Sequence, residues 1–430
     1  MGDRLLPTIF QYLLNNRLPK IQYDKAVPPV SVAMAWPSAF SVALRRWFPL
    51  SFLITLTSLG IFGFRHYHVR QRAASPSPLV AISDNTSLDL TLDAAQLAPE
   101  PQTKTTVITI KAVGDMAPGT RYSKTPQIDK KMQMFAGVEG QLKWSDLLIG
   151  NLETTLTNYP HPAKDISRPN VFAFRTAPSY TNLLRDAGFQ ILSIANNHTF
   201  DYGQQGFQDT KTNLEAAGIA PIGIKNQIHY HQHKDLTIAL IGFSTYDYHN
   251  NINNLEAAVT LVKQANEQAD ITIISVHAGA EGTGANRVRP GTEWFFRENR
   301  GDLHKFSRAV IDAGADLILG HGPHVLRAVE LYQGRLIAYS LANFVADGAL
   351  SVAGTLSESV ILEATLSSEG AFLQGRLHPV RINYQGFPFY DASGTAIQRL
   401  RSLTQQNFPD TPLTIQEDGQ MFPKILSGGN

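Results

Sequence analysis

The strongest constraint on the fold is a regular alternation of short apolar runs with longer amphipathic segments. Seven runs have the length and composition of β-strands, and several are separated by a stretch with helical periodicity. Such alternation predicts a layered α/β fold. The runs are Val107–Val113, Leu147–Gly150, Ile191–Ile194, Thr237–Gly242, Ile271–Val276, Leu317–Leu319 and Leu336–Tyr339. The predicted helices are Tyr180–Gly188, Phe207–Gly218, Leu255–Gln268 and Leu303–Gly314.

The C-terminal part has a different pattern. Two runs, Glu358–Leu366 and Ala371–Ile382, have no helix between them, which predicts an antiparallel pair of strands. Past Asn383 we expect irregular chain with one helix at Thr395–Gln405. The main domain is therefore predicted to span residues 106–382, and residues 383–430 form a C-terminal extension.

Polar residues able to bind a metal follow most of the apolar runs directly. In α/β proteins, ligands gather outside the carboxyl ends of the strands, so we expect these residues to converge in space. The candidate site residues are, in chain order, Asp115, Asn151, Glu153, Asn197, His198, Asp201, His277, Glu281, His321, His324, Ser340 and Asn343.

These signals differ in specificity. The cluster from Asn196 to Asp201 would be costly to bury without partners, and we expect Asp201 to orient His198 rather than to bind metal directly. Pro323 restricts the direction of His324 and favours a pre-organised pair of imidazoles. By themselves, the other clusters are equally compatible with turns and helix caps; Ser340 and Asn343 suit either a substrate contact or a turn.

The chemistry of the donors restricts the cofactor. The chain contains no cysteine, so a metal must be held by oxygen and imidazole donors, which suit divalent zinc, manganese or iron. One or two such ions, with an additional histidine as proton donor, fit hydrolysis of a phosphoester. The 37 basic and 36 acidic side chains nearly cancel, and no basic run is present, so no nucleic-acid partner is expected.

The N-terminal part indicates a membrane anchor. Residues 47–64 carry no charge, are flanked by arginines and nearly reach the roughly 20 residues needed to span a bilayer. A buried core helix or the apolar part of a cleaved signal are the alternatives. We expect a cytoplasmic segment at 1–46, a single span at 47–64 and a Ser- and Pro-rich flexible linker at 65–105. This organisation predicts a single-pass protein of the cell membrane with its main domain on the extracytoplasmic side.

The order of the clusters resembles the CapA or PgsA family of bacterial capsule (poly-γ-glutamate) synthesis proteins, from about Val107 to Ile382. That family is similar to calcineurin-like metallophosphatases, which implies a four-layered α/β/β/α sandwich. The resemblance implies that Asp115 binds one ion and that Asn151 or Glu153 occupies the bridging region. It further implies a second ion on Asn197, His277 and His321, with His324 completing the first site and His198 as proton donor or phosphate contact.

The chain also departs from this pattern. Ala117 stands where a metallophosphatase usually has histidine, and Asn151 stands where it has aspartate, so the first metal position is expected to be weak. In the last histidine pair, two residues intervene instead of one, and Ala342 replaces the glycine usual in the family's final motif.

Three functions remain open. The first is a metal-dependent hydrolase acting on a phosphorylated or polymeric envelope substrate. The second is a non-hydrolytic assembly factor that binds an anionic capsule polymer, such as poly-γ-glutamate, beside other membrane proteins of capsule synthesis. The third is a polysaccharide hydrolase that uses Glu153 and Glu281 as an acid and base pair.

Overall fold

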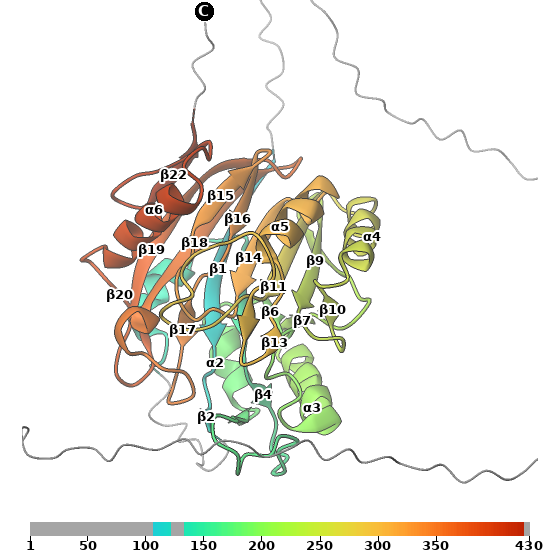
Figure 1. The fold of residues 1–430 in the computed structure, drawn as a ribbon. Coiled ribbons are helices and arrows are strands. Elements are labelled where there is room, and N and C mark those ends of the chain that lie inside the picture. The colour runs from blue at the N-terminus through green and yellow to red at the C-terminus, as the bar shows by residue number, and fades with distance from the viewer. Residues whose placement is uncertain (1–105, 122–132, 425–430) are drawn as a thin grey trace, which may run out of the picture. The chain divides into compact units, whose positions relative to one another are not determined.

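Two mixed β-sheets form the centre of the fold (Figure 1). The computed structural model describes residues 106–121 and 133–424. In the first sheet the strand order is β21-β22-β19-β18-β1-β3-β6-β7, and β17 and β20 pair with β1 and β19. Its strands are β1 (Val107–Met116), β3 (Leu147–Leu152), β6 (Ile191–Ser193), β7 (Ala220–Ile222), β17 (Asn343–Val345), β18 (Glu358–Ser367), β19 (Phe372–Ile382), β20 (Pro388–Tyr390), β21 (Leu413–Ile415) and β22 (Gln420–Pro423).

The second sheet has the order β10-β9-β11-β14-β16-β15, with β8 paired to β9. Its strands are β8 (His229–His233), β9 (Leu236–Ser244), β10 (Asn250–Asn251), β11 (Ile271–His277), β14 (Leu317–His321), β15 (Val329–Tyr332) and β16 (Arg335–Ala338). Shorter pairings join β2 (Thr120–Arg121), β4 (Thr155–Leu156) and β5 (Phe174–Thr176), and also β12 (Trp294–Phe295) with β13 (Glu298–Asn299).

Among the described residues, five α-helices cover the outer faces of the sheets, and a sixth packs against β18 and β19 of the first sheet and β15 of the second. They are α1 (Glu139–Leu142), α2 (Tyr180–Asp186), α3 (Gly203–Ala216), α4 (Leu255–Asn266), α5 (Leu303–Asp312) and α6 (Thr395–Asn407), with short 3₁₀ turns η2 (Ala136–Val138) and η3 (Gly354–Ser357). Side chains alternate across β1 and β3 because successive residues of a strand point to opposite faces. Ile110 packs toward the second sheet, whereas Leu148 packs with Leu184 of α2 and Leu214 of α3.

On the second sheet, α4 and α5 bury apolar stripes against the strands. Phe306 and Val310 of α5 are four residues apart, so they lie on one helical face, and both are buried. Each helix begins at a capping side chain: Asn254 accepts the N–H of Ala257, and Asp302 accepts the N–H of Lys305. The order of layers is therefore helix, sheet, sheet, helix, and the predicted α/β class is confirmed.

The antiparallel pair predicted after residue 358 is confirmed as β18 and β19, and the predicted C-terminal helix as α6. The expectation of otherwise irregular chain past Asn383 is wrong, because β20, β21 and β22 extend the first sheet. These strands are three or four residues long, and such short runs carry too few residues for a periodicity to be recognised.

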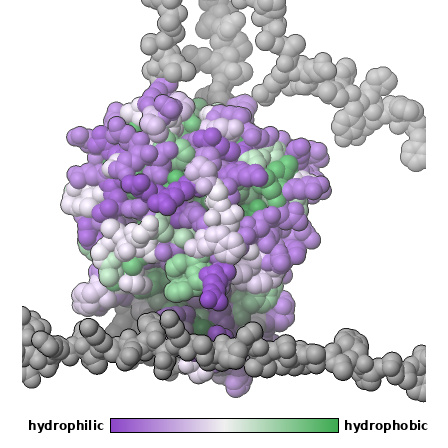
Figure 2. Space-filling view, viewed as in Figure 1, coloured by the Kyte–Doolittle hydropathy of each residue, from purple (hydrophilic) through white to green (hydrophobic). Residues whose placement is uncertain are grey.

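The predicted membrane span at 47–64 and the linker at 65–105 lie outside the described residues. Within 106–121 and 133–424, no helix combines the length and the apolar character needed to cross a bilayer. The face of the molecule shown in Figure 2 is largely hydrophilic, with apolar side chains gathered in small patches.

Candidate metal centre

The carboxyl ends of parallel strands bring the predicted donors together. In the first sheet, Asp115 of β1 lies beside Asn151 of β3 and Asn343 of β17. In the second sheet, His277 of β11 lies beside His321 of β14. The two sets meet between the sheets: Asp115 Oδ1 is 3.5 Å from His321 Nδ1, and Asn151 Nδ2 is 3.4 Å from His277 Nδ1. The sheets therefore form one polar junction from strands far apart in the sequence.

Two glycines permit this close approach. A Cβ atom on Gly114 would lie only 1.9 Å from the carbonyl oxygen of Ala342, so no other residue fits there. Gly322 has φ +107°, a conformation that L side chains rarely adopt, and a Cβ there would lie 3.1 Å from the ring of His277. Its N–H donates to Asp115 Oδ2 at 3.1 Å. The turn after β14 thus fixes Asp115.

The donor set at the junction fits a divalent cation. Asp115, Glu153 and His277 are each buried and offer ligand atoms within 4.8 Å of one another. Both carboxyl oxygens of Glu153, Nε2 of His277 and both ring nitrogens of His321 have no hydrogen-bond partner among the described residues. Leaving a buried polar atom unsatisfied costs about 1–3 kcal/mol. Carboxylate oxygens with imidazole nitrogens suit zinc, manganese or iron, and such an ion would satisfy the carboxyl of Glu153, Nε2 of His277 and one ring nitrogen of His321.

His324 closes the centre from the turn that follows β14. Its φ is +60°, in the left-handed region, so the Gly-Pro turn before it directs the ring inward. Nδ1 lies 2.9 Å from Asn343 Oδ1 and 3.2 Å from Asp115 Oδ2. Nε2 lies 3.8 Å from Glu153 Oε1 and 3.7 Å from Glu281 Oε2. His324 therefore contacts every carboxylate of the centre.

The protonation of the centre is uneven. Burial alone would lower the pKa of His324, but Glu153, Asp115 and Glu281 outweigh it and raise this pKa to about 10. Burial alone would raise the pKa of Asp115, but the adjacent imidazoles of His321 and His324 hold it well below its usual range. Burial, helped by the charges of Asp115 and Glu281, raises the pKa of Glu153 well above its usual range.

His277 is neutral in this setting. Burial lowers its pKa well below the ordinary value despite the nearby charge of Asp115. A neutral imidazole with a free ring nitrogen is the form that binds a metal. His277 is thus already in its ligand state.

His198 and Asp201 form a pair next to the centre. His198 Nδ1 lies 2.7 Å from Asp201 Oδ2, which also accepts the N–H of Phe174 at 2.6 Å. The other carboxylate oxygen of Asp201 is 2.5 Å from Lys164 Nζ. The imidazole stacks on the ring of Phe174, with centroids 4.0 Å apart. The expected orientation of His198 by Asp201 is present.

Asn196 links this pair to the centre. Its Nδ2 donates to Asn151 Oδ1 at 3.1 Å, and its Oδ1 accepts the N–H of His198 at 3.1 Å. A displacement of the His198 loop would therefore break a hydrogen bond to Asn151.

The model of the family described as bacterial capsule synthesis protein PGA_cap matches residues 109–348. This chain belongs to the PGA_cap family. The predicted resemblance to CapA proteins is thereby confirmed, and the matched range contains every predicted site residue.

Two curated relatives have related names. The chain is 32% identical over 273 residues to the PGA biosynthesis protein CapA of Bacillus subtilis (strain 168), a match that covers 58% of this chain and 67% of that protein. It is 27% identical over 277 residues to the capsule biosynthesis protein CapA of Bacillus anthracis, covering 58% of this chain and 62% of that protein. A third or more of each relative thus lies outside the match.

Solved structures show only remote likeness. The 5'-nucleotidase precursor from Thermus thermophilus aligns with 11% identity and a TM-score of 0.38, covering 70% of this chain and 59% of that one. The NAD nucleotidase of Haemophilus influenzae aligns with 13% identity and a TM-score of 0.34, covering 70% and 56%. Scores of this size carry no argument about the chemistry of the PGA_cap protein.

The remaining predicted residues have more local contacts. Asn197 has a buried Oδ1 without a hydrogen-bond partner in the described part of the chain, and its carbonyl accepts Lys164 Nζ at 3.1 Å. Ser340 is buried, and its Oγ accepts the N–H of Ala342 at 3.2 Å, as a turn residue does. Asn343 is buried and holds His324. A metal role for Asn197 and substrate contacts for Ser340 and Asn343 stay predictions.

The sequence pattern did not indicate Arg300, a buried residue of this PGA_cap protein that contacts the candidate site. Arg300 is buried, and its Nη2 lies 2.6 Å from Glu281 Oε1. The ion pair holds Glu281 beside His324. Arg300 follows the short polar strand β13 rather than an apolar run, so its position in the sequence gave no signal.

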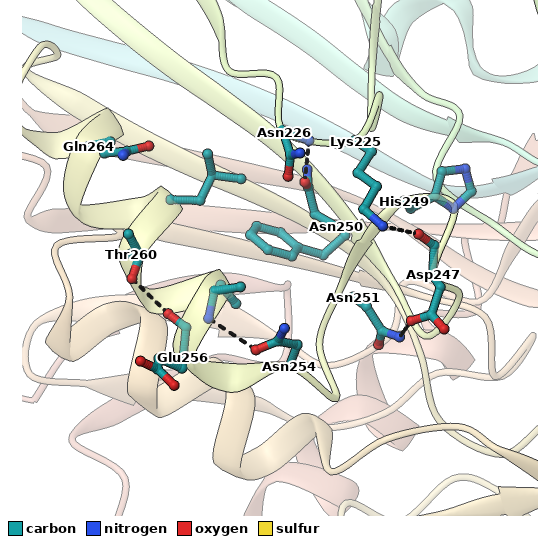
Figure 3. Close-up of a pocket in the computed structure, with 14 residues that line it drawn as sticks. Lys225, Asn226, Asp247, His249, Asn250, Asn251, Asn254, Glu256, Thr260 and Gln264 are labelled. Carbon is teal, nitrogen blue, oxygen red and sulfur yellow. Dashed lines mark hydrogen bonds between the residues drawn. The ribbon is translucent and has the colours of Figure 1, made fainter. Parts of the chain in front are cut away.

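Of two cavities, one has no predicted site residue in its wall and the other adjoins the candidate metal centre. The cavity in Figure 3, about 510 Å³, lies between α4 and the loop after β9, and no predicted site residue lines it. His249 in its wall is held by Ser244, with Nδ1 and Oγ 2.8 Å apart. A second cavity, about 370 Å³, has Glu281 in its wall and therefore adjoins the metal centre.

Proposed function

We propose that this PGA_cap protein is a membrane-anchored capsule biosynthesis protein with a metal-dependent, phosphoesterase-like hydrolase domain. The observation that carries the proposal is the group of buried, unpartnered donors on Glu153, His277 and His321. The names of the Bacillus relatives support a role in capsule or poly-γ-glutamate production. We infer that the substrate is an anionic capsule polymer or a phosphorylated envelope compound.

Five side chains would hold the cation, namely those of Asp115, Glu153, His277, His321 and His324. When bound, a divalent ion stabilises charge on phosphoryl oxygens and lowers the pKa of a coordinated water. Because Asp115, Glu153, His277 and His321 are buried, their oxygen and nitrogen donors would be held in place before substrate arrives.

His198 would transfer a proton to the leaving oxygen. Because Asp201 accepts from Nδ1, Nε2 carries a proton only when the ring is charged. Burial lowers the pKa of His198 despite the charge of Asp201, so the free protein keeps the ring mostly neutral at pH 7. An anionic substrate beside the ring favours the charged form and so prepares His198 to donate.

The test is hydrolysis of an aryl phosphate by the purified chain in the presence of manganese. Loss of a general acid lowers rates by about 10²–10⁴-fold, so His198→Ala should fall in this range while keeping its bound metal and its thermal stability. His161→Ala removes an exposed histidine and should leave the rate unchanged. Equal rates for His198→Ala and the unmodified chain would refute the assignment.

A second candidate is a non-hydrolytic assembly factor that binds the polymer. One observation favours it: the side-chain amide of Asn151 already contacts Asp115, His277 and Asn196, and Ala117 offers no ligand, so the first metal position has few donors. Deletion of the gene and complementation with His321→Ala separates the two. Full recovery of capsule polymer would favour assembly, and absence of recovery would favour hydrolysis.

We further propose that residues 47–64 anchor the protein in the cell membrane, with the PGA_cap domain on the extracytoplasmic side beside other capsule-synthesis membrane proteins. The uncharged stretch flanked by Arg46 and Arg65 supports this location. External protease applied to intact protoplasts should cleave the domain. Protection equal to that of a cytoplasmic marker would contradict the proposed orientation.

A further inference from the structure

We propose that residues 280–294 form a subsite for a carboxylate-bearing polymer, held by Arg287 and Arg289 beside the metal centre. The inference rests on the proposed function, because the subsite would present the polymer to that same centre. It assigns the substrate contacts to a loop that contributes only Glu281 to the centre itself.

The cavity that defines the subsite has a volume of about 370 Å³. Arg287, Arg289 and Trp294 lie in its wall, together with Glu281 and Glu293. Glu281 Oε2 is also 3.7 Å from His324 Nε2, so one side chain belongs to both the cavity and the metal centre. A chain bound in the cavity would therefore extend past Glu281 to the centre.

The charge of the wall favours an anion. Glu281 is paired with buried Arg300 at 2.6 Å, and both oxygens of Glu293 bind buried Arg327 at 2.7 Å. These pairs neutralise the two carboxylates of the wall. Arg287 and Arg289 are exposed and make no ion pair within the described part of the chain. Two guanidinium groups thus remain available for carboxylates, which they bind through paired N–H donors.

The cavity wall is also held in place before a ligand binds. Arg327 donates to the carbonyls of Ala285 and Ala280 at 2.6 and 3.2 Å, and Glu293 accepts the N–H of Ala280 at 3.0 Å. Backbone bonds join Glu293 with Arg300 and Gly301 at 2.8 and 2.9 Å. A preformed wall reduces the entropy lost on binding.

The hairpin next to the cavity supports a binding role. Its two central residues, Phe296 and Arg297, have φ of +46° and +68°, positions that glycine or asparagine usually occupy. Bulky residues in this conformation cost about 1–3 kcal/mol each and concentrate at functional sites. Phe296 is 74% exposed and Trp294 is 62% exposed. The hairpin therefore maintains exposed aromatic side chains at the expense of stability.

The test measures binding of a fluorescent γ-linked glutamate oligomer to the chain of residues 1–430 in detergent, by anisotropy at two salt concentrations. The variant Arg287→Gln/Arg289→Gln removes both cations. Arg287→Lys/Arg289→Lys retains the charge. Arg185→Gln/Arg376→Gln removes two exposed cations from α2 and β19 and serves as the control for net charge.

The proposal predicts that the Gln pair loses at least about tenfold in affinity and depends less on salt. The variant Arg287→Lys/Arg289→Lys should recover part of the lost affinity. The control variant should bind the oligomer with unchanged affinity. An amidated oligomer, which has no carboxylates, should bind the unmodified chain weakly. Equal affinity of the Gln pair and the unmodified chain would overturn the proposal, as would an equal loss in the control pair. Tighter binding of polyphosphate would overturn the assignment to carboxylates.

Binding is measured with and without EDTA, and this separates the two proposals. Arginine-dependent binding that persists without metal supports the subsite even if no phosphoester is hydrolysed. Absence of binding by the unmodified chain overturns the subsite even if hydrolysis is observed.

Discussion

Replacement of Glu153 by glutamine should separate metal binding from folding. Glu153 is fully buried, and neither carboxyl oxygen has a hydrogen-bond partner among the described residues. Its pKa is raised well above the ordinary value, first by burial, so burial favours the uncharged form of this carboxyl. Glutamine has the same shape and no charge. The free energy of unfolding of the metal-free variant should therefore lie within about 1 kcal/mol of that of the unmodified chain.

The effect of metal should differ between the two proteins. A ligand at 100 times its dissociation constant stabilises the folded state by about 2.7 kcal/mol. The unfolding entropy is about 2.1 cal/mol/K per residue, taken over roughly 300 described residues, so this stabilisation by the metal raises Tm by about 4 °C. If loss of the Glu153 ligand weakens binding about 100-fold, the same metal concentration adds only about 0.4 kcal/mol, a shift below about 1 °C.

The assay is thermal unfolding followed by intrinsic fluorescence, with EDTA or with manganese at a fixed concentration. Glu417→Gln removes an exposed carboxylate and is the control, for which the full metal shift is expected. A full metal shift in Glu153→Gln would refute the role of Glu153 as a ligand. A metal-free variant destabilised by several kcal/mol would refute the inference that burial favours the uncharged form of Glu153.

Two further predictions concern the same centre. Affinity for manganese should rise by about tenfold per pH unit between about pH 6 and 9, because the ion must displace a proton from His324, whose pKa is about 10. A titration that is flat with pH would contradict this. Gly322→Ala should lower the free energy of unfolding by about 1–3 kcal/mol and also weaken metal binding, since its Cβ meets the His277 ring. Gly291→Ala has a similar φ of +101° with open space around it, so it should lower stability alone, and equal metal affinities in the two variants would count against the geometry.

The sequence predicted the residues of the centre because each follows an apolar strand. Asp115 and His321 come at the ends of β1 and β14, where the strand pattern identifies them without knowledge of the fold. Their contact at 3.5 Å depends on how the two sheets pack, and no local pattern contains that information. The resemblance to a known family provided it.

Residues in loops were harder to predict. Arg300 and Lys164 hold Glu281 and Asp201 by ion pairs, but neither follows an apolar run or has a characteristic spacing. Short strands such as β20 were missed for a different reason, since three residues cannot display a period. Long-range pairing rather than local preference determines these features.

We propose that four segments far apart in the sequence, at the carboxyl ends of β1, β3, β11 and β14, supply donors to one cation. Crystals of the protein loaded with manganese allow a direct test by anomalous diffraction. We expect an anomalous peak within bonding distance of the Glu153 carboxylate and of the Nε2 atom of His277, at the junction of the two sheets. A map with no peak there, or with manganese only at surface carboxylates, would contradict it.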